Sequence, residues 1–255
     1  MTRTLTSAAA LALLCGAAFA QAPPAGPEFE AAVIKLNKSG QNDAAFDMLP
    51  SGLFSARNVP LSEVFRFAFK VRRENLVGTP GWINTDRVDI TGRAPAGTPD
   101  ETLRIMARSF LIQEFKLVTH EEQRTLPAFT LVVTKGGPKL SKAAGPGEPV
   151  CKPVPALAPE TGNVHRGCTN MTLSQLADAL TFDLAPGYID RTVVDQTGLN
   201  GAYDFRLDWA GVRFINTLGG VNIFGALERL GLKLEEERLS LPVVIIDHVE
   251  QLAEN

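Results

Sequence analysis

Histidine and cysteine are the residue types in this sequence best suited to bind metals or to act as nucleophiles. The three histidines are His120, His165 and His248, and none of them forms an H-x-x-x-H or H-E-x-x-H spacing. A zinc site would therefore need ligands from distant parts of the chain. We predict no metal and no cofactor. We retain His165, which lies close to Cys168, as a candidate ligand contact.

Two cysteines, Cys151 and Cys168, follow the N-terminal segment that contains Cys15. In an oxidising compartment, two such cysteines are expected to form a disulfide. The alternatives are a metal pair and a reactive thiol. A metal would need further ligands, and His165 is the one nearby candidate.

Catalytic motifs are missing from the sequence. It has no G-x-S-x-G elbow, no phosphate-binding G-x-x-x-x-G-K-[ST] and no G-x-G-x-x-G. Acidic neighbours such as Asp86 and Asp89, or Glu121 and Glu122, lie near expected strands. Adjacent strand residues point to opposite faces, so we interpret these carboxylates as solvated edge charges. No catalytic residue is predicted.

Trp82 is the second candidate ligand contact. It follows Pro80 and Gly81, a turn signal, in an expected loop. A tryptophan in a loop can stack on a sugar or an aromatic ligand. It can equally close the end of a small hydrophobic core, and the sequence leaves both interpretations open.

The overall composition excludes two classes of protein. The 255 residues include 25 basic and 28 acidic side chains, a net charge of −3, and 45% are hydrophobic. Enough apolar surface is present to exclude disorder over the whole length. The absence of excess Lys and Arg argues against a nucleic-acid partner.

The first residues have the pattern of a signal peptide, expected over residues 1–20. Arg3 supplies a positive start, Leu5–Ala18 is apolar, and Ala18-Phe19-Ala20 is a cleavage signature. The apolar stretch is too short for a good membrane span. We expect a mature chain without a transmembrane segment, exported to the periplasm or the extracellular space.

Two parts of the chain look like copies of one unit. Asn58-Val59-Pro60-Leu61-Ser62 matches Asn170-Met171-Thr172-Leu173-Ser174, Asp89 matches Asp204, and Leu126-Pro127 matches Leu241-Pro242. These matches keep the same order along the chain. We predict an internal duplication, with a first module over 28–140, a Pro/Gly-rich linker over 141–161 and a second module over 162–250.

Hydrophobic periodicity predicts the elements of both modules. Helices are expected from Leu61, after a Thr98 cap with Pro99 at the first helical position, after a Thr172–Gln175 capping box, and after Asn222. Strands are expected at 29–36, 87–93 and 202–209, and as two final pairs at 115–121 with 126–135 and 232–238 with 242–250. The fold class is α+β: two strand-helix-strand-helix-strand-strand modules with helices packed on small mixed or antiparallel sheets.

Several motifs resemble a known family. They are Phe29-Glu30-Ala31-Ala32-Val33-Ile34-Lys35, Gly81-Trp82-Ile83, Val132-Val133-Thr134-Lys135-Gly136-Gly137-Pro138 and Asp195-Gln196-Thr197-Gly198-Leu199-Asn200-Gly201. Together they resemble the soil-associated secreted bacterial proteins of unknown function. This family has no assigned activity. Similar domains are fused, in some proteins, to antibiotic-sensor-type membrane metallopeptidases, which implies an extracytoplasmic sensing or binding role.

The function expected from these observations is that of an exported, non-enzymatic binding or sensing module of the bacterial cell envelope. Its partner would be another envelope protein or a peptide, docked on an exposed sheet edge. The alternative is a secreted hydrolase with a dispersed active site, involving His165 near Cys168 or a pair of aspartates. A third hypothesis is a structural envelope protein without a specific ligand. The sequence predicts no oligomeric state.

Overall fold

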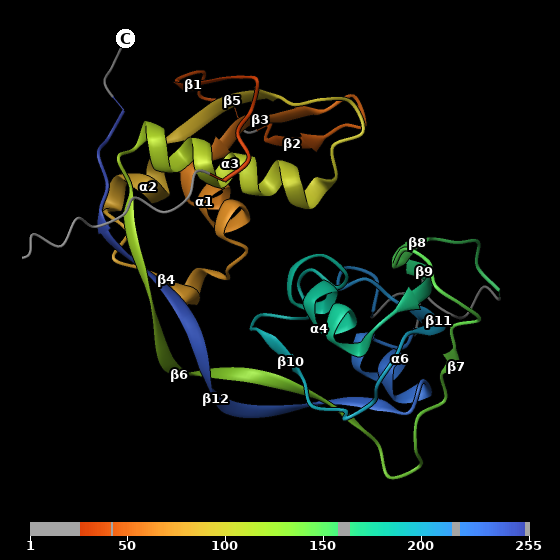
Figure 1. The fold of residues 1–255 in the computed structure, drawn as a ribbon. Helices are drawn as coiled ribbons and strands as arrows, with labels where there is room; N and C mark the ends of the chain where they lie inside the picture. The colour runs from red at the N-terminus through yellow and green to blue at the C-terminus, as the bar shows by residue number, and fades with distance from the viewer. Residues whose placement is uncertain (1–25, 42, 158–163, 216–219, 253–255) are drawn as a thin grey trace, which may run out of the picture.

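A computed structural model describes residues 26–41, 43–157, 164–215 and 220–252. The signal peptide expected over residues 1–20 lies outside these residues. Two modules lie side by side and are joined by a long two-stranded ribbon (Figure 1). Residues 26–117 are called the first module and residues 137–231 the second module. Strands β6 (Val118–Val133) and β12 (Leu232–His248) form the ribbon.

Each module contains a four-stranded sheet, and the two sheets have the same layout. In the first module the strand order is β1 (Ala31–Leu36), β5 (Arg87–Arg93), β3 (Leu53–Pro60) and β2 (Ala45–Met48). In the second it is β7 (Ser141–Lys142), β11 (Tyr203–Trp209), β9 (Val164–Met171) and β8 (Val150–Pro153). All these pairings are antiparallel. The α+β class with small sheets is therefore confirmed.

Helices follow the strands in matching places. They are α1 (Leu61–Phe69), the short α2 (Gly81–Thr85) and α3 (Asp100–Glu114) in the first module, and α4 (Leu173–Phe182) and α6 (Ile223–Arg229) in the second. The Thr172–Gln175 capping box and the Asn222 cap are confirmed. The Thr98 cap is wrong: α3 begins at Asp100, and the Thr98 hydroxyl donates to the Pro95 carbonyl at 2.6 Å. The Pro95–Thr98 turn uses that hydroxyl itself, so it does not cap the helix.

The ribbon belongs to both modules. Strands β6 and β12 pair antiparallel along nearly their whole length, in a sheet ordered β10 (Val193–Asp195), β6, β12 and β4 (Leu76–Val77). The short β4 of the first module pairs with the end of β12, and β10 of the second module pairs with the end of β6. Strand β6 thus runs from the first module to the second, where β10 pairs with it. Strand β12 runs in the opposite direction, from the second module to the first, where β4 pairs with it.

This ribbon corrects one prediction. Each of the two expected final strand pairs is a single continuous strand, and the partner comes from the other half of the chain. The four residues between Glu121 and Leu126 include no Gly, Pro, Asn or Asp, so nothing there favours a tight turn. The run Val243–Ile246 lies between β6 and β4, in the interior of the sheet.

Two hydrophobic cores depend on the ribbon. The first core, around Phe54, Phe65 and Leu111, includes Val244 and Ile246 from β12. The core of the second module, around Leu176, Leu207 and Trp209, includes Phe129 and Leu131 from β6. Because β12 contributes Leu232 to the second core and Val244 and Ile246 to the first, we expect the two modules to fold together.

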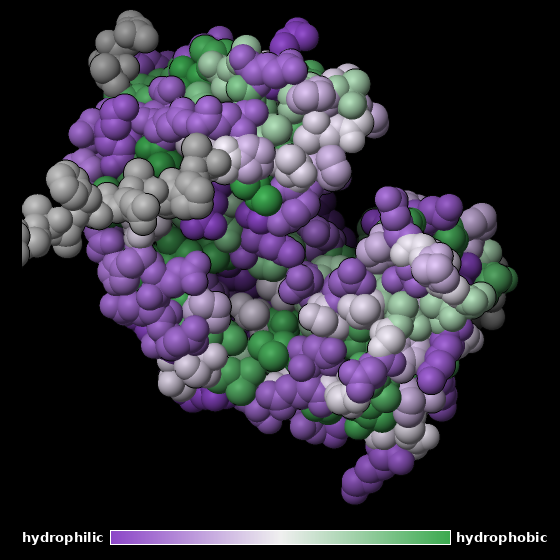
Figure 2. Space-filling model, viewed as in Figure 1, coloured by the Kyte–Doolittle hydropathy of each residue, from purple (hydrophilic) through white to green (hydrophobic). Residues whose placement is uncertain are grey.

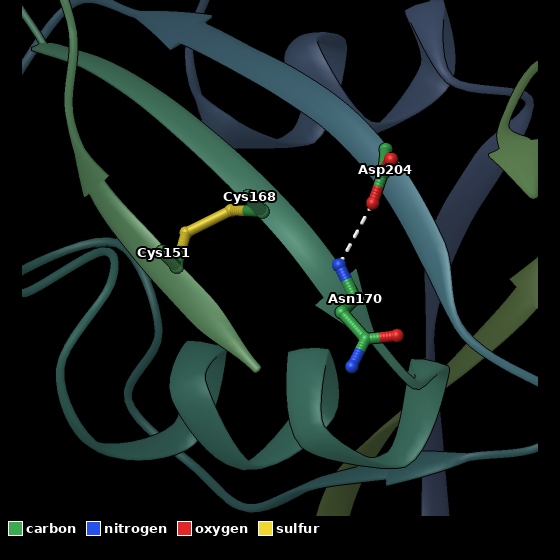
Figure 3. The surroundings of a disulfide bond; sticks show 4 residues. All are labelled: Cys151, Cys168, Asn170 and Asp204. Carbon is green, nitrogen blue, oxygen red and sulfur yellow. Dashed lines mark hydrogen bonds between the residues drawn. A yellow bond between two sulfur atoms is a disulfide. The ribbon is translucent and has the colours of Figure 1, made fainter. Parts of the chain in front are cut away.

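A strained corner recurs at the start of α1 and α4. Asn58 and Asn170 both have a φ of 53°, in the left-handed region that asparagine tolerates better than most residues. Their backbone N–H groups donate to the Asp89 and Asp204 carboxylates at 2.9 and 2.8 Å, and Figure 3 shows the second pair. These details agree with the predicted repeat, and an origin by duplication stays a prediction.

The Pro/Gly-rich stretch at 141–161 contributes two outer strands, β7 and β8, to the sheet of the second module. Prolines are tolerated at such edges because one side of the strand needs no backbone donor. Cys151 on β8 lies opposite Cys168 on β9, and the disulfide between them is present (Figure 3). Among the described residues, no helix has the length and apolar character needed to cross a membrane.

Candidate docking groove

Strand β2 forms one open edge of the first sheet. It pairs with β3 on one side, and no described strand pairs with its other side. A three-residue turn at Pro50–Gly52 joins the two strands, with Gly52 at a φ of 80°. A Cβ at this glycine would lie 2.1 Å from the Ala94 carbonyl oxygen, so the turn requires glycine.

The hydrogen-bond register identifies which amides of β2 face outward. The Leu49 N–H donates to the Leu53 carbonyl at 2.9 Å. Bonded and non-bonded pairs alternate in an antiparallel ladder, so Ala45 and Asp47 exchange hydrogen bonds with β3. The N–H and C=O groups of Phe46 and Met48 therefore point toward the open edge.

Helix α1 runs beside this edge and forms the second wall of a groove. Its apolar stripe, Leu61, Val64, Phe65, Ala68 and Phe69, is buried in the core. Phe67 lies off that stripe, on the polar side with Glu63, Arg66 and Lys70. Its ring meets the Phe46 ring edge-on with 4.6 Å between centroids. The two rings give the groove an apolar floor between the strand and the helix.

A hollow of about 330 Å³ lies at this place. It is lined by Ala44, Ala45, Phe46, Val59, Pro60, Glu63 and Phe67. Six of these seven residues are apolar. A strand edge with unpaired amides beside an apolar groove and a helix has the physical elements that peptide-binding domains use to add a strand.

The groove continues into a second hollow between the modules. This inter-module cleft has a volume of about 510 Å³ and shares Glu63 and Phe67 with the first hollow. Met48, Lys70 and Arg104 line it on the side of the first module, and Phe182 and Asp183 on the side of the second. Figure 2 shows the face between the modules as a hollow with both polar and apolar patches.

Lys70 connects the two modules across the cleft. It caps the end of α1 in a left-handed conformation, with a φ of 50°. Its ammonium lies 3.1 Å from the Asp178 carboxylate on α4 and 5.9 Å from the centre of the Phe182 ring. Arg72 adds a second link by donating to the Thr181 carbonyl at 2.6 Å. These contacts bridge the two modules beside the cleft.

The candidate residue His165 lies elsewhere, on the sheet of the second module. Its Nδ1 is 2.7 Å from Asp208 Oδ1, and Arg206 binds the same carboxylate. Burial acts to raise the pKa of Asp208, but the hydrogen bonds from Arg206 and His165 outweigh it and lower the pKa. The Cys168 sulfur, which the hydrolase alternative would use near His165, is held in the disulfide.

The other candidate, Trp82, lies on α2 of the first module. Its ring stacks on Phe115 with 6.2 Å between centroids and packs against the first core. Trp82 and His165 are in different modules, and neither lines the groove or the cleft. Within the described residues, no group of three His, Cys, Asp or Glu side chains is arranged to hold a metal ion.

Sequence reasoning missed the groove residues, although one signal was present. Phe67 interrupts the polar side of an amphipathic helix, at a position where the 3.6-residue period predicts a charged or polar residue. Phe46 and Asp183 had no comparable signal, because their positions depend on how the strand edge and the modules pack.

The fold and the groove define a two-module α+β protein with one sheet edge open beside a helix. The family described as "Protein of unknown function (DUF3738)" matches residues 62–249. The chain belongs to this family. No curated protein and no solved structure matches it.

Proposed function

We propose that this chain is an exported, non-enzymatic binding module of the bacterial cell envelope, and that it binds an extended segment of another protein or a peptide. The segment lies along β2 as a fifth strand of the first sheet. The observation that carries the proposal is the pair of outward-facing amides, Phe46 and Met48, beside an apolar groove.

Backbone pairing and side-chain burial act together in this mode of binding. Main-chain hydrogen bonds give affinity, and alternate side chains of the added strand enter the groove and give specificity. Side chains with period two would place an apolar group against Phe46 and Phe67. The other edge strand of the same sheet, β1, is flanked by a hollow rich in polar groups, lined by Glu28, Glu30 and Gln113 among others.

Export and sensing belong to the same proposal. The N-terminal pattern and the Cys151–Cys168 disulfide are compatible with an oxidising compartment outside the cytoplasm. The resemblance to soil-associated secreted proteins, including domains joined to antibiotic-sensor-type metallopeptidases, supports a role in extracytoplasmic sensing.

The test compares two tryptophan substitutions on opposite edges of one sheet. Ala44 is exposed and lines the groove, so Ala44→Trp fills the groove without disturbing the core. Val33 on β1 is 61% exposed and serves as the matched control, Val33→Trp. The probe is a fluorescein-labelled panel of extended, Val- and Thr-rich peptides of about ten residues, read by anisotropy.

The expected result is that peptides bind the unmodified chain and Val33→Trp equally, and bind Ala44→Trp at least about tenfold more weakly. Equal binding by both variants would show that β2 is not the docking edge. If no peptide of the panel binds at millimolar concentration, the proposed function is wrong.

A further inference from the structure

The inter-module cleft adds a charged compartment to the end of the groove. Because the groove and the cleft share Glu63 and Phe67, a strand lying along β2 would bring its next side chains to the cleft wall. Met48, whose amide faces the open edge, lines this second hollow. A peptide paired with β2 therefore passes the mouth of the cleft without bending away from the sheet.

The charges around the cleft favour a cation. Four carboxylates of its lining, from Glu63, Asp100, Glu101 and Asp183, face three cationic side chains, from Arg66, Lys70 and Arg104, which leaves a net charge of −1. All three cations already have a carboxylate partner at 3.1 Å or less. Within the described part of the chain, no cation lies within ion-pair distance of the Asp100 or Asp183 carboxylate.

A nearby cation would stabilise the Asp183 carboxylate in its charged form. The surrounding protein raises the pKa of its carboxyl by desolvation, and the attraction of Lys70 offsets this only in part. Lys70 itself is committed to Asp178. The carboxylate remains open to water through the cleft mouth, so a ligand can reach it.

The cleft also contains an aromatic side chain. Phe182 is 37% exposed, and the Lys70 ammonium already lies over its ring. The exposed part of this ring therefore offers apolar surface to a ligand and not a second cation site. The aliphatic stem of a lysine or arginine would meanwhile lie against Phe67 and Met48.

We propose that the inter-module cleft is a specificity pocket for a lysine or arginine side chain of the segment docked on β2, with Asp183 and Asp100 as its anionic contacts. This inference rests on the proposed function and names the chemistry of the ligand: an extended segment with apolar residues followed by a basic one. An anionic group is disfavoured because every cation in the cleft already has its own carboxylate.

The experiment measures the binding of two matched peptides to three forms of the full chain. The peptides are the best binder of the Val- and Thr-rich panel carrying either lysine or norleucine at the position over the cleft. Norleucine keeps the aliphatic stem and removes the ammonium. The chain is unmodified, Asp183→Asn, or Glu237→Gln. Glu237 is an exposed acid on β12 that lines neither the groove nor the cleft, so it controls for the loss of one negative charge.

For the unmodified chain and Glu237→Gln, we expect the lysine peptide to bind about fivefold more tightly than the norleucine peptide, the effect of an ion pair. For Asp183→Asn the preference falls to about twofold. Raising the salt concentration lowers the preference in the unmodified chain, since part of it is electrostatic.

The outcomes separate the two proposals. Equal binding of lysine and norleucine peptides to the unmodified chain, with Ala44→Trp still blocking both, overturns the cation pocket and leaves strand docking intact. A lysine preference that disappears in Asp183→Asn but is unaffected by Ala44→Trp overturns strand docking and leaves the cation pocket intact. Equal loss of the preference in Asp183→Asn and Glu237→Gln would show a general charge effect and would refute a specific contact at Asp183.

Discussion

Breaking the Cys151–Cys168 disulfide tests how the two modules depend on each other. The cysteines are 17 residues apart in sequence, and both lie in the sheet of the second module. In the chain-entropy model, a loop of this size corresponds to about 3 kcal/mol of stabilisation. For a chain of this length, such a loss lowers the midpoint of thermal unfolding by about 6–12 °C.

The ribbon determines whether this loss of stability affects one module or both. Since β12 supplies side chains to both cores and pairs with β6 along the ribbon, we expect calorimetry to show one cooperative transition that shifts as a whole. The assay compares the oxidised chain, the chain reduced with a phosphine, and Cys151→Ala/Cys168→Ala. The double variant should unfold at the same temperature with and without reductant. Two separate transitions, of which the reductant shifts only one, would refute the coupling of the modules.

Three further predictions concern single carboxylates. Asp208→Asn should lower the free energy of unfolding in urea by about 1–3 kcal/mol, because Arg206 and His165 lose a charged acceptor. The pKa of Asp208 is lowered, so this contribution is present above the usual value near 3.8 and is lost as the pH falls through the lowered pKa. The pKa of His120, raised by hydrogen bonds to Asp247 and Glu122, should lie above 6.5 by NMR titration and fall in Asp247→Asn; its stabilising contribution is present below 6.5 and is lost as the pH rises through the raised pKa. Asp183→Asn should leave the unfolding temperature at neutral pH unchanged or raise it, because the folded state disfavours this carboxylate in its charged form. A lower unfolding temperature for Asp183→Asn would contradict the argument from desolvation.

Local signals in the sequence predicted the elements that depend on local interactions. The stripe of α1 and the caps at Thr172 and Asn222 are properties of a few consecutive residues, and the structure has them where they were expected. The correspondence of Asn58 with Asn170 was visible as a repeated motif. Its physical reason, a left-handed corner bonded to an aspartate on the neighbouring strand, required the structure.

The long strands could not be predicted from local patterns. A strand of sixteen or seventeen residues and a hairpin of two shorter strands have the same alternation of side chains, and the choice depends on the available partner. In this chain the partner of each half of β6 lies about a hundred residues or more away. The sequence had no signal for a pairing at that distance.

The groove could not be predicted from the sequence for a related reason. Phe46 looks like an ordinary core residue of a short strand, and only the absence of a further strand beyond β2 leaves it at an open edge. Asp183 follows α4 and reaches the first module only because the ribbon brings the two modules together. Binding surfaces assembled from separate elements in this way have no signature in consecutive residues.

Amide exchange at Phe46 and Met48 tests the central claim, strand docking on β2, most directly. In the unbound chain these two N–H groups face the open edge, so they should exchange quickly with deuterium while those of Ala45 and Asp47 are protected by β3. Adding the lysine peptide should slow the exchange of Phe46 and Met48 by at least about tenfold and leave Ala45 and Asp47 little changed. Peptide binding with unchanged exchange at Phe46 and Met48 would contradict the account.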